Sequence, residues 1–183
     1  LLSFFVSIAV YQRKGTVRGG DYFFLMIVAV SIWCLGGTFE QAVTTVEAKT
    51  FWSVFTYLAI PLIPFAFLSF VLRFTQSSGF HIKLTKILFF IFPATAFLAA
   101  ATNSYHKLLW PAVTLSNGAA GITADYGHGL FFYIVVVVTY SAVGATILHL
   151  LRGIWSFSGL FRKQLLLLLI AQILPISVNA VYV

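Results

Sequence analysis

Few side chains in this 183-residue chain are suited to acid–base or metal chemistry. It has four acidic residues, four histidines and one cysteine, Cys34, so a disulfide within the chain is excluded. His106, Asp125 and His128 lie in one stretch, but their spacing matches no common set of metal ligands. The motifs of metal hydrolases, nucleotide-binding loops and serine hydrolases are absent. We therefore expect no catalytic residue, no metal site and no cofactor.

A second group of residues introduces polar or aromatic side chains into or beside strongly apolar stretches, which favours ligand binding. Glu40 lies near the end of one apolar stretch. An acid inside a membrane is energetically costly, and such residues usually have a function. The hydroxyl of Tyr57 lies deeper and needs a hydrogen-bond partner. Gln172 and Asn179 are seven residues apart and so share one helix face. The candidate ligand-binding residues are Glu40, Trp52, Tyr57, His106, Trp110, Gln172 and Asn179.

Each candidate also has a purely structural interpretation that the sequence leaves open. Glu40 would then lie at the lipid headgroups, and Trp52 would belong to an interfacial aromatic belt. His106 would cap a helix, and the two amides would hydrogen-bond neighbouring helices. Three prolines are treated in the same way: they predict fixed bends or, alternatively, hinges. These are Pro61, Pro64 and Pro175.

The elements that position these residues follow from the composition. Hydrophobic residues make up 61% of the chain and charged residues 8%, against roughly 45–50% and about 25% in soluble domains. The mean hydropathy is +1.01. This balance excludes a soluble enzyme, a nucleic-acid-binding domain and a disordered segment. We predict an all-α integral membrane protein, a polytopic helix bundle forming a single domain over residues 1–183.

Six apolar runs give the expected spans. Full-length runs of about 20 residues fit helices rather than the shorter alternating strands of a membrane barrel. The first run is too short to span, and the last stops at Val183, so we expect a fragment in which a seventh helix follows. The predicted spans are about 1–12, 22–43, 51–72, 84–102, 128–151 and 165–183.

The basic residues predict an orientation. Nine of the eleven Lys and Arg residues lie in or beside the loops after the first, third and fifth runs. Cytoplasmic loops carry such an excess, so we expect a multi-pass cell-membrane protein whose first visible helix runs from outside to inside. The long segment 103–127 would then lie outside, as a loop over the outer mouth of the bundle.

Several motifs, taken in order, carry a family resemblance. Glu40 closes the second run, and the third opens with Lys49 and Trp52. Thr102-Asn103-x-x-His106 ends the fourth run, with Trp110 beyond it. The remaining matches are Tyr57, Pro61, Pro64, Phe70-Val71-Leu72-Arg73-Phe74-Thr75, Arg162-Lys163-Gln164, Pro175, Asn179 and Tyr182. This order resembles the N-terminal seven-transmembrane region of prokaryotic sensor histidine kinases. In that family the region precedes kinase, PAS or diguanylate-cyclase output domains.

The resemblance implies a signal-sensing transmembrane domain. We expect an unidentified small-molecule or lipid ligand, or a membrane cue, to act at the outer halves of the second, third and sixth helices. The expected partners are the lipid bilayer and a second copy in a homodimer, with no nucleic acid. Enzyme activity would lie in an output domain outside these residues. The alternatives are a small-molecule transporter or channel, although no ionisable residue lies mid-span, and a structural subunit of a membrane complex.

Overall fold

The computed structural model describes the chain except residues 1, 14, 16–17, 78–79, 119–120 and 183. At residues 2–4, 13, 80–82, 118 and 174–182 it describes the backbone only. Over the described residues it has eight helices and one two-stranded sheet. The elements are α1 (Leu2–Arg13), α2 (Gly20–Ala42), α3 (Val46–Thr56), α4 (Leu62–Phe74), α5 (Phe80–Ala101), α6 (Asn103–His106), β1 (Val113–Gly118), β2 (Gly121–Tyr126), α7 (Leu130–Ser156) and α8 (Gly159–Tyr182).

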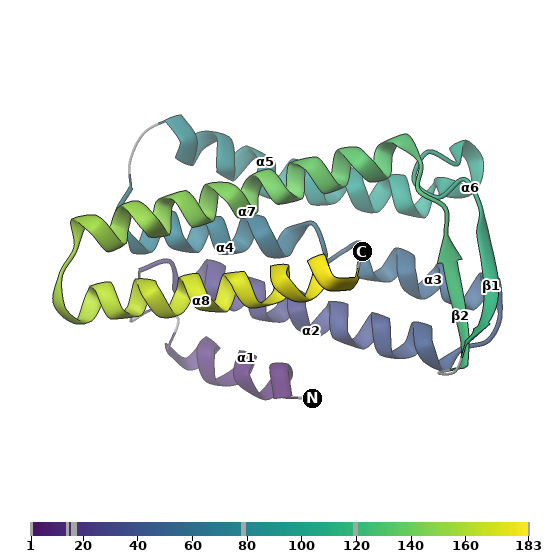
Figure 1. The fold of residues 1–183 in the computed structure, drawn as a ribbon, viewed down its shortest axis with the longest axis horizontal. Coiled ribbons are helices and arrows are strands. Elements are labelled where there is room, and N and C mark those ends of the chain that lie inside the picture. Colours follow the sequence, from purple (N-terminus) through teal and green to yellow (C-terminus); the bar gives the residue numbers. More distant parts are fainter. Residues whose placement is uncertain (1, 14, 16–17, 78–79, 119–120, 183) are drawn as a thin grey trace.

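The long helices run side by side in an elongated bundle, and apart from the α3–α4 connection in its middle, the described connecting segments lie at its two ends (Figure 1). One end, which we call the hairpin end, holds the α2–α3 connection, α6, β1 and β2. The other, which we call the basic end, holds the α1–α2, α4–α5 and α7–α8 connections. As far as the structure describes them, the loops in which the sequence has its Lys and Arg excess therefore lie together, opposite the hairpin.

Helix α4 is the centre of the bundle. It packs against α2, α5 and α7, and its residues are buried without a break from Pro64 to Leu72. A helix that is apolar on all sides is buried in a protein core or in a membrane, and α4 is enclosed by its neighbouring helices. Two apolar clusters meet along it, one with α5 and α7 and the other with α7 and α8.

The third apolar run forms two helices instead of one. Helix α3 ends at Thr56, residues 57–61 form turns, and α4 begins at Leu62. Pro61 and Pro64 have no N–H to donate to the carbonyls of Tyr57 and Ile60 four residues earlier, which interrupts the helical hydrogen-bond ladder. The two prolines thus lie where the helix is interrupted between α3 and α4, and their role as a hinge stays a prediction.

The lipid-facing character of the bundle is visible in its surface. Within the described residues, α2, Lys83–Ala101 of α5, and α7 are long and apolar enough to cross a membrane, while α4 is apolar but shorter. Large apolar side chains point outward from these helices, among them Phe90 (70% exposed) and Val137 (64%). Exposure of this kind is unfavourable in water and is expected against hydrocarbon.

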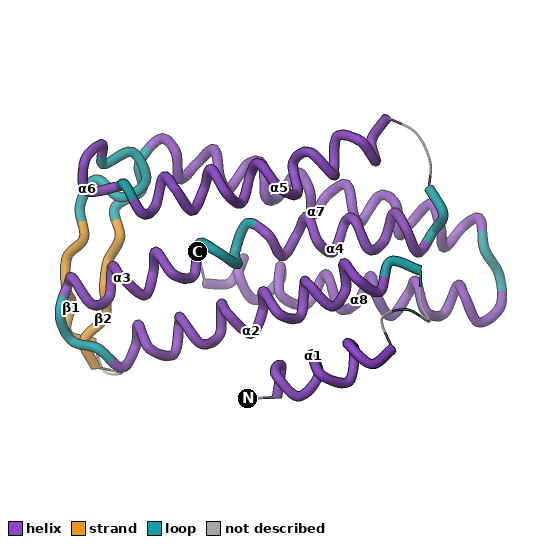
Figure 2. The backbone as a smooth tube through the Cα atoms, turned by 180° about the vertical axis from the view of Figure 1, so that it is seen from behind, coloured by secondary structure: helices purple, strands orange, loops and turns teal. Residues whose placement is uncertain are grey.

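The segment 103–127 differs from the expected loop. After α6, β1 and β2 pair as an antiparallel hairpin, from Val113 opposite Tyr126 to Gly118 opposite Gly121. The helical fold class is confirmed, and within the segment that was expected to be a loop the structure adds this one hairpin. Gly121 adopts a φ of +110° beside the turn, a conformation that favours glycine. Figure 2 shows the hairpin crossing the ends of the helices rather than continuing them.

Candidate functional site

Three segments meet through one tyrosine at the hairpin end. The hydroxyl of Tyr126, at the end of β2, donates a hydrogen bond to Oε1 of Glu40 on α2 at 2.8 Å. The same hydroxyl lies 2.5 Å from Oγ of Ser53 on α3. Because the only hydroxyl hydrogen of Tyr126 is directed to the carboxylate, Ser53 is the donor in the second bond. We call Glu40, Ser53 and Tyr126 the hairpin triad.

A buried lysine is hydrogen-bonded to the backbone of the triad residue Glu40. The Lys49 side chain is 0% exposed, and its Nζ donates to the backbone carbonyl of Glu40 at 2.8 Å. That carbonyl belongs to the last turn of α2, where a positive charge interacts favourably with the helix dipole. Lys49, Ser53 and Thr56 are all buried and follow one helix face, so α3 presents a polar stripe to α2 and the hairpin.

Close approach of α2 and α3 is permitted by a glycine. A Cβ atom at Gly36 would lie only 2.5 Å from Cγ2 of Thr56 and 3.2 Å from the ring of Phe55. A similar atom at Gly37 would meet nothing within 4 Å. Gly36 therefore lets the backbones approach as small residues do in membrane bundles, which brings Ser53 within reach of the hairpin.

The environment of Tyr126 keeps its phenol protonated. Burial raises the pKa of this hydroxyl above its usual range, and the nearby Glu40 carboxylate raises it further, while the hydrogen bond from Ser53 acts in the opposite direction. A protonated phenol is the form that donates a hydrogen bond. The phenol of Tyr126 is therefore in its hydrogen-bond-donating form at neutral pH.

Three aromatic rings, which we call the aromatic cluster, connect the triad to the interruption between α3 and α4. The ring of Trp110 lies 5.1 Å from that of Tyr126 and 5.3 Å, edge to face, from that of Tyr57. Trp110 and Tyr57 are both buried, at 5% and 7% exposed. Tyr57 directly follows α3, at the first residue of the turns before Pro61. The hairpin thus contacts the position where the backbone changes from α3 to α4.

The amide of Asn103 fixes Trp110 in place. Its Nδ2 donates to the carbonyl of Trp110 at 2.9 Å. Its Oδ1 accepts from the backbone amides of Leu109 and Trp110 at 3.0 and 3.1 Å. Three bonds from one buried side chain replace those that irregular backbone would otherwise lack. Asn103 is a positioning residue for the aromatic cluster.

The sequence candidates divide into those at this site and those elsewhere. Glu40, Tyr57 and Trp110 belong to the site. Trp52 directly precedes Ser53 of the triad and stacks on Phe39, the residue before Glu40 on α2, with ring centroids 4.5 Å apart. His106 serves its own turn, with Nδ1 accepting from the amide of Leu108 at 3.0 Å and Nε2 lying 3.2 Å from Oγ1 of Thr102.

The candidates on α8 do not join the site in the described structure. Gln172 is partly exposed on that helix, which packs against α7. The side chains of Pro175 and Asn179 lie outside the described residues. Their proposed roles stay predictions. Across the described part of the chain, no three His, Cys, Asp or Glu side chains are placed to hold a metal ion together.

Sequence reasoning did not select Ser53, Tyr126, Lys49 or Asn103 as site residues. Lys49 and Asn103 entered only through the family resemblance. One signal was available for α3: Lys49, Ser53 and Thr56 recur at spacings of four and three within an apolar run, which marks a polar helix face. No comparable signal marks Tyr126, because its role depends on where the hairpin folds.

Comparison with known proteins supplies one match. The family described as the N-terminal seven-transmembrane region of histidine kinase matches residues 1–183. No curated protein matches the chain, and no solved structure does.

Proposed function

This chain belongs to the family of N-terminal seven-transmembrane regions of histidine kinases, and from that premise we propose that its hairpin end perceives a signal and relays it to an output domain. The chain is a sensor region of the membrane and not the catalytic domain of the kinase. Its task is therefore to convert a cue into a change of helix arrangement. In our proposal the hairpin end faces outward and the basic end faces the cytoplasm.

The observation that carries the proposal is the hairpin triad. Two hydrogen bonds of one hydroxyl join β2 to both α2 and α3. A ligand with its own hydrogen-bond donor would compete with Tyr126 for the Glu40 carboxylate. Its binding would favour an arrangement in which the hairpin is released, by as much as its affinity differs between the two arrangements. The ligand is a small molecule or lipid, or the cue is a property of the membrane.

In this proposal the conformational change passes along the aromatic cluster. Release of Tyr126 removes a neighbour of Trp110, and Trp110 contacts Tyr57 beside the break before Pro61. A change there alters how α3 meets α4, and α4 packs against α2, α5 and α7. Pro61, Pro64 and Pro175 would act as hinges in this transition. Gln172 and Asn179 would complete the ligand pocket from α8, and a homodimer would pass the change to the output domain.

The test compares two tyrosines in the full-length kinase reconstituted in liposomes. Tyr126→Phe removes the hydroxyl of the triad, whereas Tyr105→Phe makes the same change on a side chain that is 90% exposed. Losing a buried hydrogen bond to a charged group shifts an equilibrium by about 1.5–3 kcal/mol. We expect basal autophosphorylation, measured by transfer of labelled phosphate from ATP, to change about fivefold or more for Tyr126→Phe only.

An equal response of the two variants would contradict the proposal. So would an unchanged autophosphorylation rate in Tyr126→Phe if amide hydrogen exchange shows that the hairpin has loosened. That second result would mean that the triad is released without any effect on output.

A further inference from the structure

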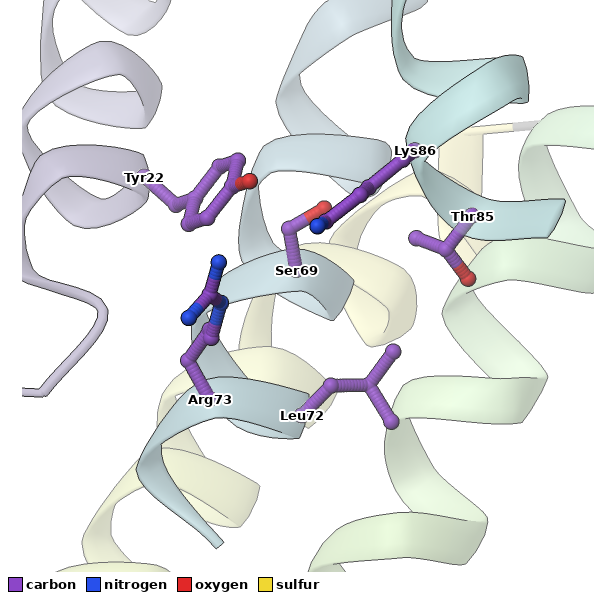
Figure 3. A pocket seen from close by; sticks show the side chains of 6 residues that line it. All are labelled: Tyr22, Ser69, Leu72, Arg73, Thr85 and Lys86. Carbon is purple, nitrogen blue, oxygen red and sulfur yellow. The ribbon is translucent and has the colours of Figure 1, made fainter. Parts of the chain in front are cut away.

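Besides the hairpin triad, polar side chains also gather around a recess at the basic end of the bundle. It lies between α2, α4 and α5, and at about 10 Å³ its interior has room for one water molecule or a single oxygen atom. Figure 3 shows side chains from all three helices converging there. The lining residues are Tyr22, Ser69, Leu72, Arg73, Thr85 and Lys86.

Local packing holds the three helices in this arrangement. Gly19 precedes α2 with a φ of +80°, and a Cβ atom there would lie 2.8 Å from Cβ of Arg73. The start of α2 therefore lies directly against the end of α4. On the other side, the ring of Tyr22 packs edge to face on Phe89 of α5 at 5.5 Å. Tyr22 is in this way fixed between the two helices that supply the cations.

A buried hydroxyl of the recess lacks a hydrogen-bond partner. Ser69 is 5% exposed, and its hydroxyl has no hydrogen-bond partner. Buried hydroxyls in folded proteins nearly always have one, so an exception calls for an explanation. Within the described structure, no carboxylate pairs with Arg73 or Lys86, and no acidic residue lines the recess. Two cations and a buried hydroxyl thus face a space that no protein acceptor fills.

We propose that this recess binds a phosphate group, either on the headgroup of an anionic phospholipid or as free phosphate. The guanidinium of Arg73 matches two phosphate oxygens with a fork of donors, and the ammonium of Lys86 supplies a second charge. One oxygen enters the recess and accepts from Ser69, and the hydroxyl of Tyr22 donates from the opposite side. In Figure 3 the hydroxyl of Thr85 points away from these groups, so Thr85 contributes its methyl group.

The position of the recess suits a lipid headgroup. Arg73 is in the last turn of α4, Tyr22 is near the start of α2, and Lys86 is near the start of α5. Helix ends lie at the level of the headgroups in a bilayer. Basic pockets between membrane helices on the cytoplasmic side are known to bind phosphorylated headgroups. The proposal is independent of the signal-sensing role of the opposite end.

The binding test uses the full-length protein purified in a neutral detergent. Retained dioleoyl phosphatidylglycerol is counted by native mass spectrometry over a lipid titration, and inorganic phosphate is titrated separately by calorimetry at constant ionic strength. Ser69→Ala and Lys86→Gln remove two of the proposed donors. Ser141→Ala and Lys163→Gln are matched controls, because Ser141 bonds its own helix and Lys163 is an exposed cation of the basic end.

We expect saturable binding of one phosphate-bearing ligand, weakened about tenfold by each recess variant and less than about twofold by each control. Binding of phosphatidylglycerol without binding of inorganic phosphate identifies the lipid as the source. Binding of inorganic phosphate that competes with the lipid identifies free phosphate as a ligand. Saturable binding that is equal in the recess variants and their controls overturns the proposal, as does the absence of saturable binding for both probes.

Discussion

The two ends of the bundle use the same kinds of side chain in opposite ways. Ser53 at the hairpin end and Ser69 at the basic end are both 5% exposed. Ser53 hydrogen-bonds Tyr126, whereas Ser69 has no partner. A lysine accompanies each serine: Lys49 is buried and bonded to a carbonyl, while Lys86 is exposed at a recess.

The difference indicates what each end is built to do. Polar groups that satisfy one another hold segments together, and in the mechanism that we propose a ligand competes for a bond that already exists. Polar groups without partners are ready for a ligand that the chain does not supply. The hairpin end is therefore a closed network, and the basic end an open one.

The largest expected effect comes from removing the amide that supports the closed network. Asn103→Ala leaves two backbone amides and one carbonyl at residues 109 and 110 without partners. Each buried unsatisfied group costs about 1–3 kcal/mol, so we expect a loss of about 3 kcal/mol or more in the free energy of unfolding. Unfolding of the purified protein in mixed micelles of increasing denaturing detergent measures this loss.

Asn117→Ala is the control for this substitution. Asn117 is exposed on β1, and surface changes of this kind usually stay within about 0.5 kcal/mol. If the two alanine variants lose equal stability, Asn103 does not anchor the hairpin end as described.

The two serines test the comparison directly. Ser53→Ala removes the bond to Tyr126 and should lower the free energy of unfolding by about 1 kcal/mol. Ser69→Ala removes a buried hydroxyl without a partner, so in ligand-free detergent we expect no loss and a gain of up to about 1 kcal/mol. The same micelle titration reports both. A loss in Ser69→Ala as large as that in Ser53→Ala would show that the recess is not an open network.

The smallest effect concerns pH. Burial, followed by the Glu40 carboxylate, raises the pKa of Tyr126 in the folded protein. A raised pKa means that the neutral phenol stabilises the fold fully below the unfolded value of about 10. This contribution is lost as the pH rises through the folded value. Glu40→Gln should lower the pKa of Tyr126 without restoring its usual value, since the burial remains.

This shift can be measured by absorbance titration of tyrosinate, with the Tyr126→Phe spectrum subtracted at each pH. The wild-type difference curve should rise at a higher pH than that of Glu40→Gln. Coincident curves would mean that the carboxylate does not act on the phenol.

Sequence reasoning was strongest where one physical rule dominates. Long apolar runs with few charged residues indicate membrane-spanning segments. In hydrocarbon a single such segment must form a helix, because a helix hydrogen-bonds all of its own backbone N–H and C=O groups. The basic loops after the first, third and fifth runs gather at one end of the structure, as alternating connections in a bundle must (Figure 1). Glu40, Tyr57 and Trp110, three of the predicted ligand-binding residues, lie in the part of the structure that Tyr126 and Trp110 connect. Their role in binding a ligand stays a prediction.

The remainder depended on tertiary contacts that no local pattern encodes. An Asn117-Gly118 pair, of the kind that favours tight turns, lies at the end of β1, but the two strands are short and alternate weakly. The interruption before Pro61 looked like a kink because the run stays apolar throughout. Tyr126 and Ser53 are 73 residues apart, and only the folded hairpin brings them together.

The interruption between α3 and α4 has a consequence for how the molecule opens. At 11 residues, α3 is shorter than the roughly 12–15 residues that an isolated helix needs to persist in water. It is held by α2 through Gly36 and by the hairpin through Tyr126, whereas α4 is enclosed by the core. Helix α3 and the hairpin therefore form one cooperative unit, whose amides should exchange together and before those of α4. The third apolar run therefore consists of two helices with different supports, one held by α2 and the hairpin and the other enclosed by the core.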